Sequence, residues 1–235
     1  MSILPKPVYL LAGGRGRNRQ VPDPLIQLAL KEAGKDLPEV AYIGTASGDD
    51  TSFFEMLGRM FNACGAGKVT HAFITPKDAD ISEAKGIIES SDIVYVSGGD
   101  VERGMHPLIE KGMVEFLLSL YKAGKPFFGI SAGSIMLARE WVRWRDPDND
   151  STAELFPCLG IAPILCDTHD EEGGWEELKA ALALKSEGAI GYGLVSATAV
   201  KVFADGRVDA VGGAIHRFQR IDNKITRILD LLPPR

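Results

Sequence analysis

The 235-residue sequence is poor in cysteine and histidine, with only three of the first and four of the second. Cys64, Cys158 and Cys166 form no CxxC pair and are odd in number, which argues against a disulfide framework and against a structural zinc site. The sequence also lacks an excess of positive charge, because 32 Asp and Glu residues outnumber 26 Lys and Arg residues and leave a net charge of −6. This balance provides no global attraction to nucleic acid or to an anionic membrane, so we expect neither as a partner.

A long hydrophobic run is missing as well. The apolar stretch within MSILPKPVYLLAGG is interrupted by proline, is far shorter than the roughly 20 residues that a membrane span needs, and shows no small-residue cleavage pattern. Apolar residues nevertheless make up 45% of the chain, enough for a substantial core. We therefore expect a globular, cytoplasmic protein.

Short runs rich in Val, Ile and Tyr alternate with segments of helical periodicity. The runs predict strands near 8–12, 40–45, 69–74, 93–97 and 126–130. Helices are predicted near 23–34, 51–63, 82–89, 105–123 and 132–143. Most of the strands are continuously apolar, as expected of a mostly parallel sheet covered by helices on both faces. The pattern predicts an α/β three-layer sandwich.

The chain changes in character after about residue 144. The segment RWRDPDNDSTAELFP is polar and rich in Pro, Asn and Asp, so it is predicted to be a long loop. A short strand, the helix WEELKAALAL and several short β-strands with an ADGR turn follow, which form a small C-terminal β extension. No linker or repeat divides the chain, and residues 1–235 are expected to form one domain.

Residues 129–133, GISAG, match the G-x-S-x-G pattern of a nucleophile elbow. The pattern follows a predicted strand and precedes a predicted helix, so the hydroxyl of Ser131 would project above the sheet edge. The N–H of Ala132 would then face developing negative charge on an oxyanion. The alternative is a glycine-rich turn that only lets the strand and the helix pack closely.

A serine nucleophile needs a base, for which histidine is the usual residue. His71 lies within a strand pattern, and His106 and His216 lie near a helix start and in a late strand. His169 follows a short apolar strand and would emerge at the carboxyl rim of the sheet, so it is the best candidate. The triad acid stays open among Asp146, Asp148, Asp150, Asp167, Asp170, Glu171 and Glu172.

Other rim loops offer groups that could bind a substrate. Gly98 and Gly99 in SGGDVER can approach a ligand closely and complete an oxyanion hole, with Asp100 beside them. Arg15 in GGRGRNR, which lacks the G-K-[ST] of a phosphate-binding loop, is a candidate for a substrate carboxylate. Arg139 is another, and it shares a helix face with Arg143 if the helix after Ser131 continues that far.

Residues 94–137, VYVSGGDVERGMHPLIEKGMVEFLLSLYKAGKPFFGISAGSIML, resemble the signature region of the peptidase E and cyanophycinase family of serine peptidases. The double glycine with Asp100, the Gly-Lys-Pro strand entry at 124–126 and the elbow occupy the family's positions. AYIGTASGDD upstream and LGIAPILCDTHDEE downstream extend the resemblance to about four-fifths of the chain, and His169 takes the family's histidine position. The resemblance implies a class I glutamine-amidotransferase-like fold, related to flavodoxin-like folds.

The sequence departs from that family at a late strand. Where many members carry Glu or Asp two residues after Gly-Leu, GYGLVSATAVKV has Ser196, so the acid would come from Asp146 or Asp170, or the site would work as a Ser-His dyad. Some members also have Asn and Trp where Asp100 and Ile130 stand, which argues against aspartyl-dipeptide specificity. No cysteine replaces Ser131, which disfavours amidotransferase chemistry.

The resemblance implies a serine peptidase that cleaves a small peptide, isopeptide or related amide without a metal or cofactor. Ser131 and His169 would be catalytic, with Asp146 as the acid, and the N–H groups of Ala132, Gly98 and Gly99 would form the oxyanion hole. Two alternatives stay open: an esterase or other acyl hydrolase, and a non-catalytic member that binds a small molecule or a protein. A homodimer is compatible with the sequence.

Overall fold

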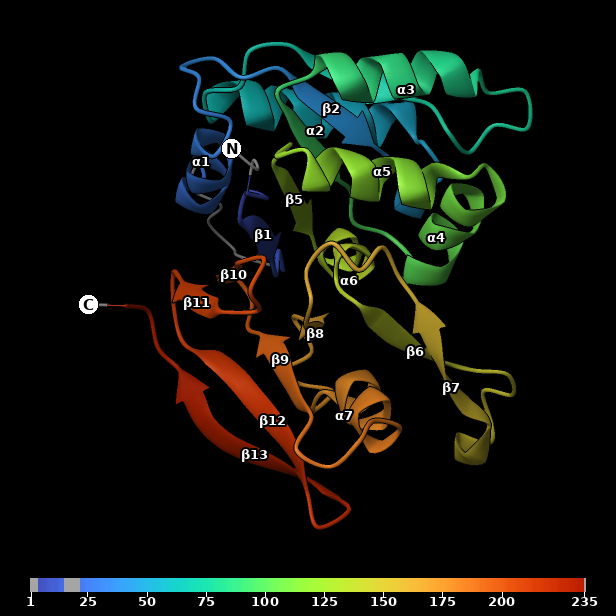
Figure 1. The fold of residues 1–235 in the computed structure, drawn as a ribbon, viewed down its shortest axis with the longest axis vertical. Helices are drawn as coiled ribbons and strands as arrows, with labels where there is room; N and C mark the ends of the chain where they lie inside the picture. Colours follow the sequence, from blue (N-terminus) through green and yellow to red (C-terminus); the bar gives the residue numbers. More distant parts are fainter. Residues whose placement is uncertain (1–3, 15–21, 235) are drawn as a thin grey trace.

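The computed structural model describes residues 4–14 and 22–234. Its largest sheet has seven strands in the order β11-β10-β1-β5-β4-β2-β3 (Figure 1). The strands are β1 (Val8–Leu11), β2 (Val40–Ile43), β3 (Val69–Ala72), β4 (Ile93–Val96), β5 (Phe127–Ile130), β10 (Ala199–Val202) and β11 (Val208–Val211). The first five pair in parallel, and β10 and β11 continue the sheet antiparallel. The expected mostly parallel α/β sheet is confirmed.

Alternate residues of the central strands feed two separate hydrophobic cores. Val94 and Val96 of β4 pack in one core, whereas Ile93 and Tyr95 pack in the other. The first face is covered by α3 (Ile81–Ser90), α4 (Val101–Glu110), α5 (Met113–Lys122) and α6 (Ala132–Leu137). The second face is covered by α1 (Pro24–Lys31) and α2 (Thr51–Ala63). Both faces of these strands are therefore buried, which explains why they are continuously apolar.

Two predicted helices differ from the observed ones. Residues 101–122 form α4 and α5 instead of one helix, because Gly112 between them has a φ of 64°, which interrupts helical geometry. The helix after Ser131 ends at Leu137 and is followed by β6 (Glu140–Trp144). The prediction of a helix over 132–143 is therefore wrong in its second half.

The segment after β6 is a strand pair, whereas the sequence predicted a long loop. β6 pairs antiparallel with β7 (Ala153–Pro157), and the 3-10 helix η2 (Asp150–Thr152) lies in the connection. Arg143 joins the two strands by ion pairs with Glu154 of β7 and Glu102 of α4. The polar composition that indicated a loop thus belongs to two half-exposed strands and the turn between them.

A second sheet has the order β13-β12-β9-β8. Its strands are β8 (Leu165–Thr168), β9 (Ile190–Leu194), β12 (Ile215–Ile221) and β13 (Lys224–Leu231). Helix α7 (Glu176–Ala183) packs on this sheet through a small core that includes Trp175, Leu178 and Phe218. Figure 1 shows the second sheet and α7 on the side of the molecule opposite α3. In the described part of the chain, no helix is long and apolar enough to cross a membrane.

Candidate active site

Ser131 lies on a sharp turn between β5 and α6. Its backbone has a φ of 56° and a ψ of −126°, and its N–H donates to the carbonyl of Leu11 at 3.0 Å. The turn requires both glycines, because a Cβ on Gly129 would lie 2.6 Å from the carbonyl carbon of Gly133, and one on Gly133 would lie 2.1 Å from the oxygen of Val96. The strand-turn-helix geometry predicted for GISAG is confirmed.

His169 follows the end of β8 and reaches the serine. Its Nε2 lies 2.7 Å from Oγ of Ser131, within hydrogen-bond distance. The histidine backbone has a φ of 45°, and its N–H donates to the carbonyl of Leu194 in the neighbouring strand β9. The second sheet thus holds the imidazole over the edge of the first sheet. Two residues 38 positions apart in the sequence are brought together, as the sequence analysis expected.

Ala132 and the loop after β4 lie beside the same serine. Ala132 is the first residue of α6, where N–H groups have no partner within the helix. Gly99 has a φ of 145°, and a Cβ there would lie 2.2 Å from the oxygen of Ala46, so the loop after β4 packs tightly against η1 (Thr45–Ser47). A Cβ on Gly98 would lie 3.3 Å from Cβ of Ser131. The SGG loop therefore faces the serine directly.

The structure does not bring Asp146 to the histidine. Asp146 lies in the exposed turn between β6 and β7, where its carboxylate accepts the N–H of Asp148 at 3.1 Å. Ser196 stands where the resemblance implies an acid in many members. A carboxylate reaches this position from another residue, because Glu171 accepts the N–H of Ser196. Burial raises the pKa of Glu171, but hydrogen bonds from Ser196 and the charge of His169 outweigh it and leave the pKa below its usual value. Glu171 was one of several open candidates in the sequence, and only the fold distinguishes it.

One pocket beside the serine is acidic. It has a volume of about 410 Å³, includes Ser131, Gly99 and His169, and is also lined by Asp100, Asp167, Asp170, Glu176 and Glu177. Asp167 is 6% exposed. Burial raises its pKa to about 7, and the nearby charges of Glu177 and Asp170 add to the rise. Near neutral pH this carboxyl is therefore partly protonated.

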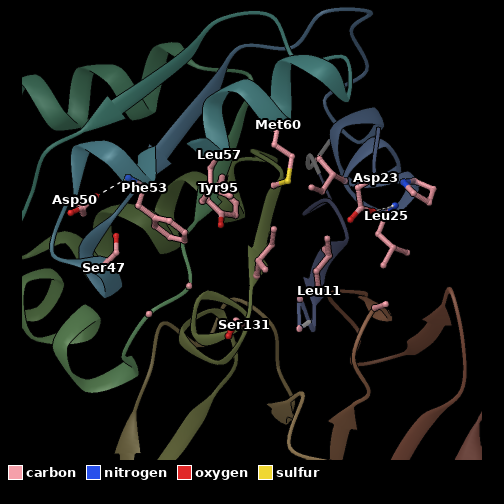
Figure 2. A pocket seen from close by; sticks show the side chains of 18 residues that line it. Leu11, Asp23, Leu25, Ser47, Asp50, Phe53, Leu57, Met60, Tyr95 and Ser131 are labelled. Atoms are coloured by element: carbon pink, nitrogen blue, oxygen red, sulfur yellow. Dashed lines mark hydrogen bonds between the residues drawn. The ribbon is translucent and has the colours of Figure 1, made fainter. Parts of the chain in front are cut away.

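A second and larger pocket opens on the other side of Ser131, with a volume of about 830 Å³. Its walls include Leu25 of α1 and Phe53, Leu57 and Met60 of α2 (Figure 2). These residues cannot be recognised as pocket residues from the sequence, because apolar positions on an amphipathic helix show the same periodicity whether they face a core or a cavity.

Of the remaining candidates, the structure describes Arg139 and Asp100. Arg15 is outside the described residues. Arg139 is exposed, lines neither of the two pockets and precedes a strand, so the helix face that it would share with Arg143 does not exist. Asp100 lines the acidic pocket but also caps α4 by accepting the N–H of Arg103 at 2.7 Å.

The other three histidines have structural surroundings. His71 is buried with its Nε2 3.1 Å from Oδ1 of Asp49, as expected of a core residue. His106 lies beside Glu102 on α4, and His216 packs against Trp175. All three cysteines are free and buried. Within residues 4–14 and 22–234, no group of three or more His, Cys, Asp or Glu side chains is placed to hold a metal ion.

Comparisons with known proteins find a family and individual relatives. The model of peptidase family S51 matches residues 8–209. The chain is 26% identical over 135 residues to the uncharacterized peptidase YgaJ of Bacillus subtilis strain 168, a match that spans 57% of each protein and so little more than half of that relative.

Two solved structures share the fold. A peptidase from an acI-B1 actinobacterium superimposes with a TM-score of 0.70 at 16% identity and covers 98% of both chains. A protein of Listeria monocytogenes EGD-e, provisionally assigned as a peptidase E, gives a TM-score of 0.63 at 17% identity and covers 88% of this chain and 98% of its own. At 16% and 17% identity, both similarities show a shared fold and no more.

Proposed function

This chain belongs to peptidase family S51, and we propose that it is a serine peptidase that hydrolyses a small peptide or related amide through Ser131 and His169. The observation that carries the proposal is the 2.7 Å contact between Oγ of Ser131 and Nε2 of His169 at a strand-turn-helix elbow. A hydroxyl becomes an effective nucleophile when a base within hydrogen-bond reach takes its proton.

The reaction proceeds in two halves. Oγ of Ser131 attacks the scissile carbonyl carbon while Nε2 of His169 accepts the hydroxyl proton, which gives a tetrahedral intermediate. The C–N bond then breaks as the imidazolium returns that proton to the leaving amine, which leaves an acyl-enzyme. A water molecule, deprotonated by the same nitrogen, attacks the ester carbonyl, and collapse of the second intermediate releases the acid and restores the serine hydroxyl.

Backbone N–H groups would stabilise the negative oxygen that forms in both halves. Ala132 at the start of α6 and Gly99, with Gly98 beside it, are the donors in this proposal, since they flank the serine. Loss of one such donor typically costs about 3 kcal/mol of transition-state stabilisation. Their fixed positions on the tight turn and on the packed SGG loop mean that little reorganisation is needed during the reaction.

A fluorophosphonate probe tests the nucleophile. We expect stoichiometric labelling of Ser131 in the wild type, no labelling of Ser131→Ala, and unchanged labelling of Ser151→Ala, a control in the exposed helix η2. A library of dipeptides and matched esters then separates a peptidase from an esterase. An intact wild-type protein that stays unlabelled would remove the hydrolase proposal and leave a binding function.

A further inference from the structure

The larger of the two pockets at Ser131 is lined mostly by apolar side chains. Most of its described lining forms two walls of apolar side chains, and Figure 2 shows the serine below the labelled side chains of these walls. One wall comes from α2 and the other from the end of β1 and the start of α1. The apolar lining side chains are Leu11, Pro24, Leu25, Ile26, Phe53, Leu57, Met60, Ile130 and Ala197.

The two carboxylates at this cavity are already engaged. Asp23 accepts the N–H of Leu25 at 2.8 Å and caps α1, and Asp50 accepts the N–H of Phe53 at 2.7 Å and caps α2. No Lys or Arg occurs among the cavity-lining residues that the structure describes. Within those residues, a substrate carboxylate would therefore meet two negative charges and no positive one.

The position of the base decides which half of the substrate enters this cavity. His169 lines the acidic pocket and is absent from the described lining of the apolar cavity. Because the imidazole must give its proton to the leaving amine, that amine lies on the acidic side of Ser131. The group attached to the carbonyl carbon then lies on the opposite side, in the apolar cavity.

We infer that the apolar cavity binds the acyl half of the substrate and selects a large apolar side chain at the residue that supplies the scissile carbonyl. The inference rests on the proposed function. A volume of about 830 Å³ accommodates a Leu, Met or Phe side chain with further chain beyond it, within the range usual for small-ligand sites. Burial of such a side chain favours binding, whereas an Asp or Glu side chain loses its hydration without gaining a cation from the lining residues that the structure describes.

Wild-type protein and two series of probes test the inference. Alkyl fluorophosphonates that carry ethyl, butyl and octyl groups should label Ser131 faster as the chain lengthens, by at least about tenfold between the ends of the series. Dipeptides that differ only in the first residue should give a kcat/KM for Leu or Phe that exceeds the value for Asp by roughly 100-fold. Equal rates across both series, or a preference for Asp, would overturn the inference.

A pair of methionines on α2 offers a matched variant and control. Met60 is half-buried and lines the cavity, whereas Met56 is 45% exposed and does not. Met60→Lys should lower kcat/KM for the Leu dipeptide by roughly tenfold and raise it for the Asp dipeptide, while Met56→Lys should change neither. A Met60→Lys protein that keeps the wild-type preference would contradict the assignment.

The probe results also separate this inference from the proposed function. Labelling of Ser131 without dependence on chain length retains the nucleophile and removes only the apolar specificity. If Ser131 is not labelled at all, the proposed nucleophile is wrong, and the inferred apolar specificity, which depends on it, is wrong as well. Thermal unfolding of each variant shows whether a loss of rate reflects the cavity or the fold, and the wild-type series stands independently of any variant that fails to fold.

Discussion

The two pockets at Ser131 differ in the elements that build them. The acidic pocket is lined by the β8–α7 region, whose own small core rests on the second sheet. The apolar cavity is lined by α1, α2 and the edge of the central sheet. Ser131 and Gly99 line both pockets.

This difference assigns distinct tasks to the two sheets. In the proposed mechanism the central sheet supplies the nucleophile, and α1 and α2 on one of its faces supply most of the apolar walls, so this part of the molecule fixes one serine beside a cavity. The second sheet supplies the histidine and most of the charged groups, so proton transfer and pH dependence should reside there. Changes on the acidic side should alter kcat and its pH profile, and changes on the apolar side should alter substrate preference.

The largest expected effect comes from the acidic side. His169→Gln removes the group that takes and returns the proton, so we expect kcat to fall by at least about 1000-fold. Binding of a non-reactive apolar ligand, such as 1-octanol, should stay within about threefold of wild type, because His169 does not line the apolar cavity among the described residues. Steady-state kinetics and calorimetry measure the two quantities. A loss of binding as large as the loss of kcat would show that the two pockets are not independent.

Asp167 gives the next effect, on stability. A pKa that rises from 3.8 in the unfolded chain to about 7 in the fold means that the native state holds its proton more tightly. The contribution of this proton to the free energy of unfolding is therefore fully present below about pH 4. It is lost as pH rises through about 7. Asp167→Asn, which keeps an oxygen to accept the N–H of Thr168, avoids that loss.

The expected gain for Asp167→Asn is at most about 4 kcal/mol above pH 7, and it should vanish below pH 4. Chemical unfolding of wild type and variant at pH 3.5, 5.5 and 8 measures it. Asp148→Asn, in the exposed turn between β6 and β7, is the control and should change stability by less than about 0.5 kcal/mol at every pH. A variant less stable than wild type at pH 8 would mean that the ionised carboxylate is the favoured form.

Sequence patterns were sufficient where a local rule decides the structure. The strand-turn-helix position of Ser131 and its two glycines was predicted from five residues, because only a side-chain-free backbone fits that turn. The five parallel strands were identified because burial on both faces leaves a continuous apolar run. The position of His169 beside Ser131 was predicted because a residue after a short apolar strand emerges at the rim of the sheet.

The same patterns were insufficient where tertiary packing decides. The polar segment around Asp146 connects two paired strands, across which Arg143 and Glu154 form an ion pair, and this pairing has no local signal in the sequence. The sequence could not distinguish Glu171 from the adjacent carboxylates, since the fold alone directs Glu171 to the N–H of Ser196. The apolar cavity was equally invisible, because a core and a pocket have the same periodicity.

A variant of Glu171 gives the smallest expected effect and tests whether a change on the acidic side alters kcat without altering substrate preference. Its carboxylate interacts with the charge of His169, so it favours the imidazolium that forms during the reaction. Glu171→Gln keeps an oxygen to accept the N–H of Ser196 but removes the charge. Because the side chain is half-buried and partly screened, we expect kcat to fall by about three- to tenfold, with no change in the preference between Leu and Asp dipeptides.

Salt separates an electrostatic role for Glu171 from a structural one. The difference between wild type and Glu171→Gln should shrink as salt rises from 0.05 to about 1 M, because screening weakens the interaction of the charge with the imidazolium. Glu172→Gln changes the charge of an exposed neighbour and should leave kcat within about twofold. A loss of activity that is independent of salt, or an equal loss in Glu172→Gln, would place the effect in the loop and not in the charge that faces the histidine.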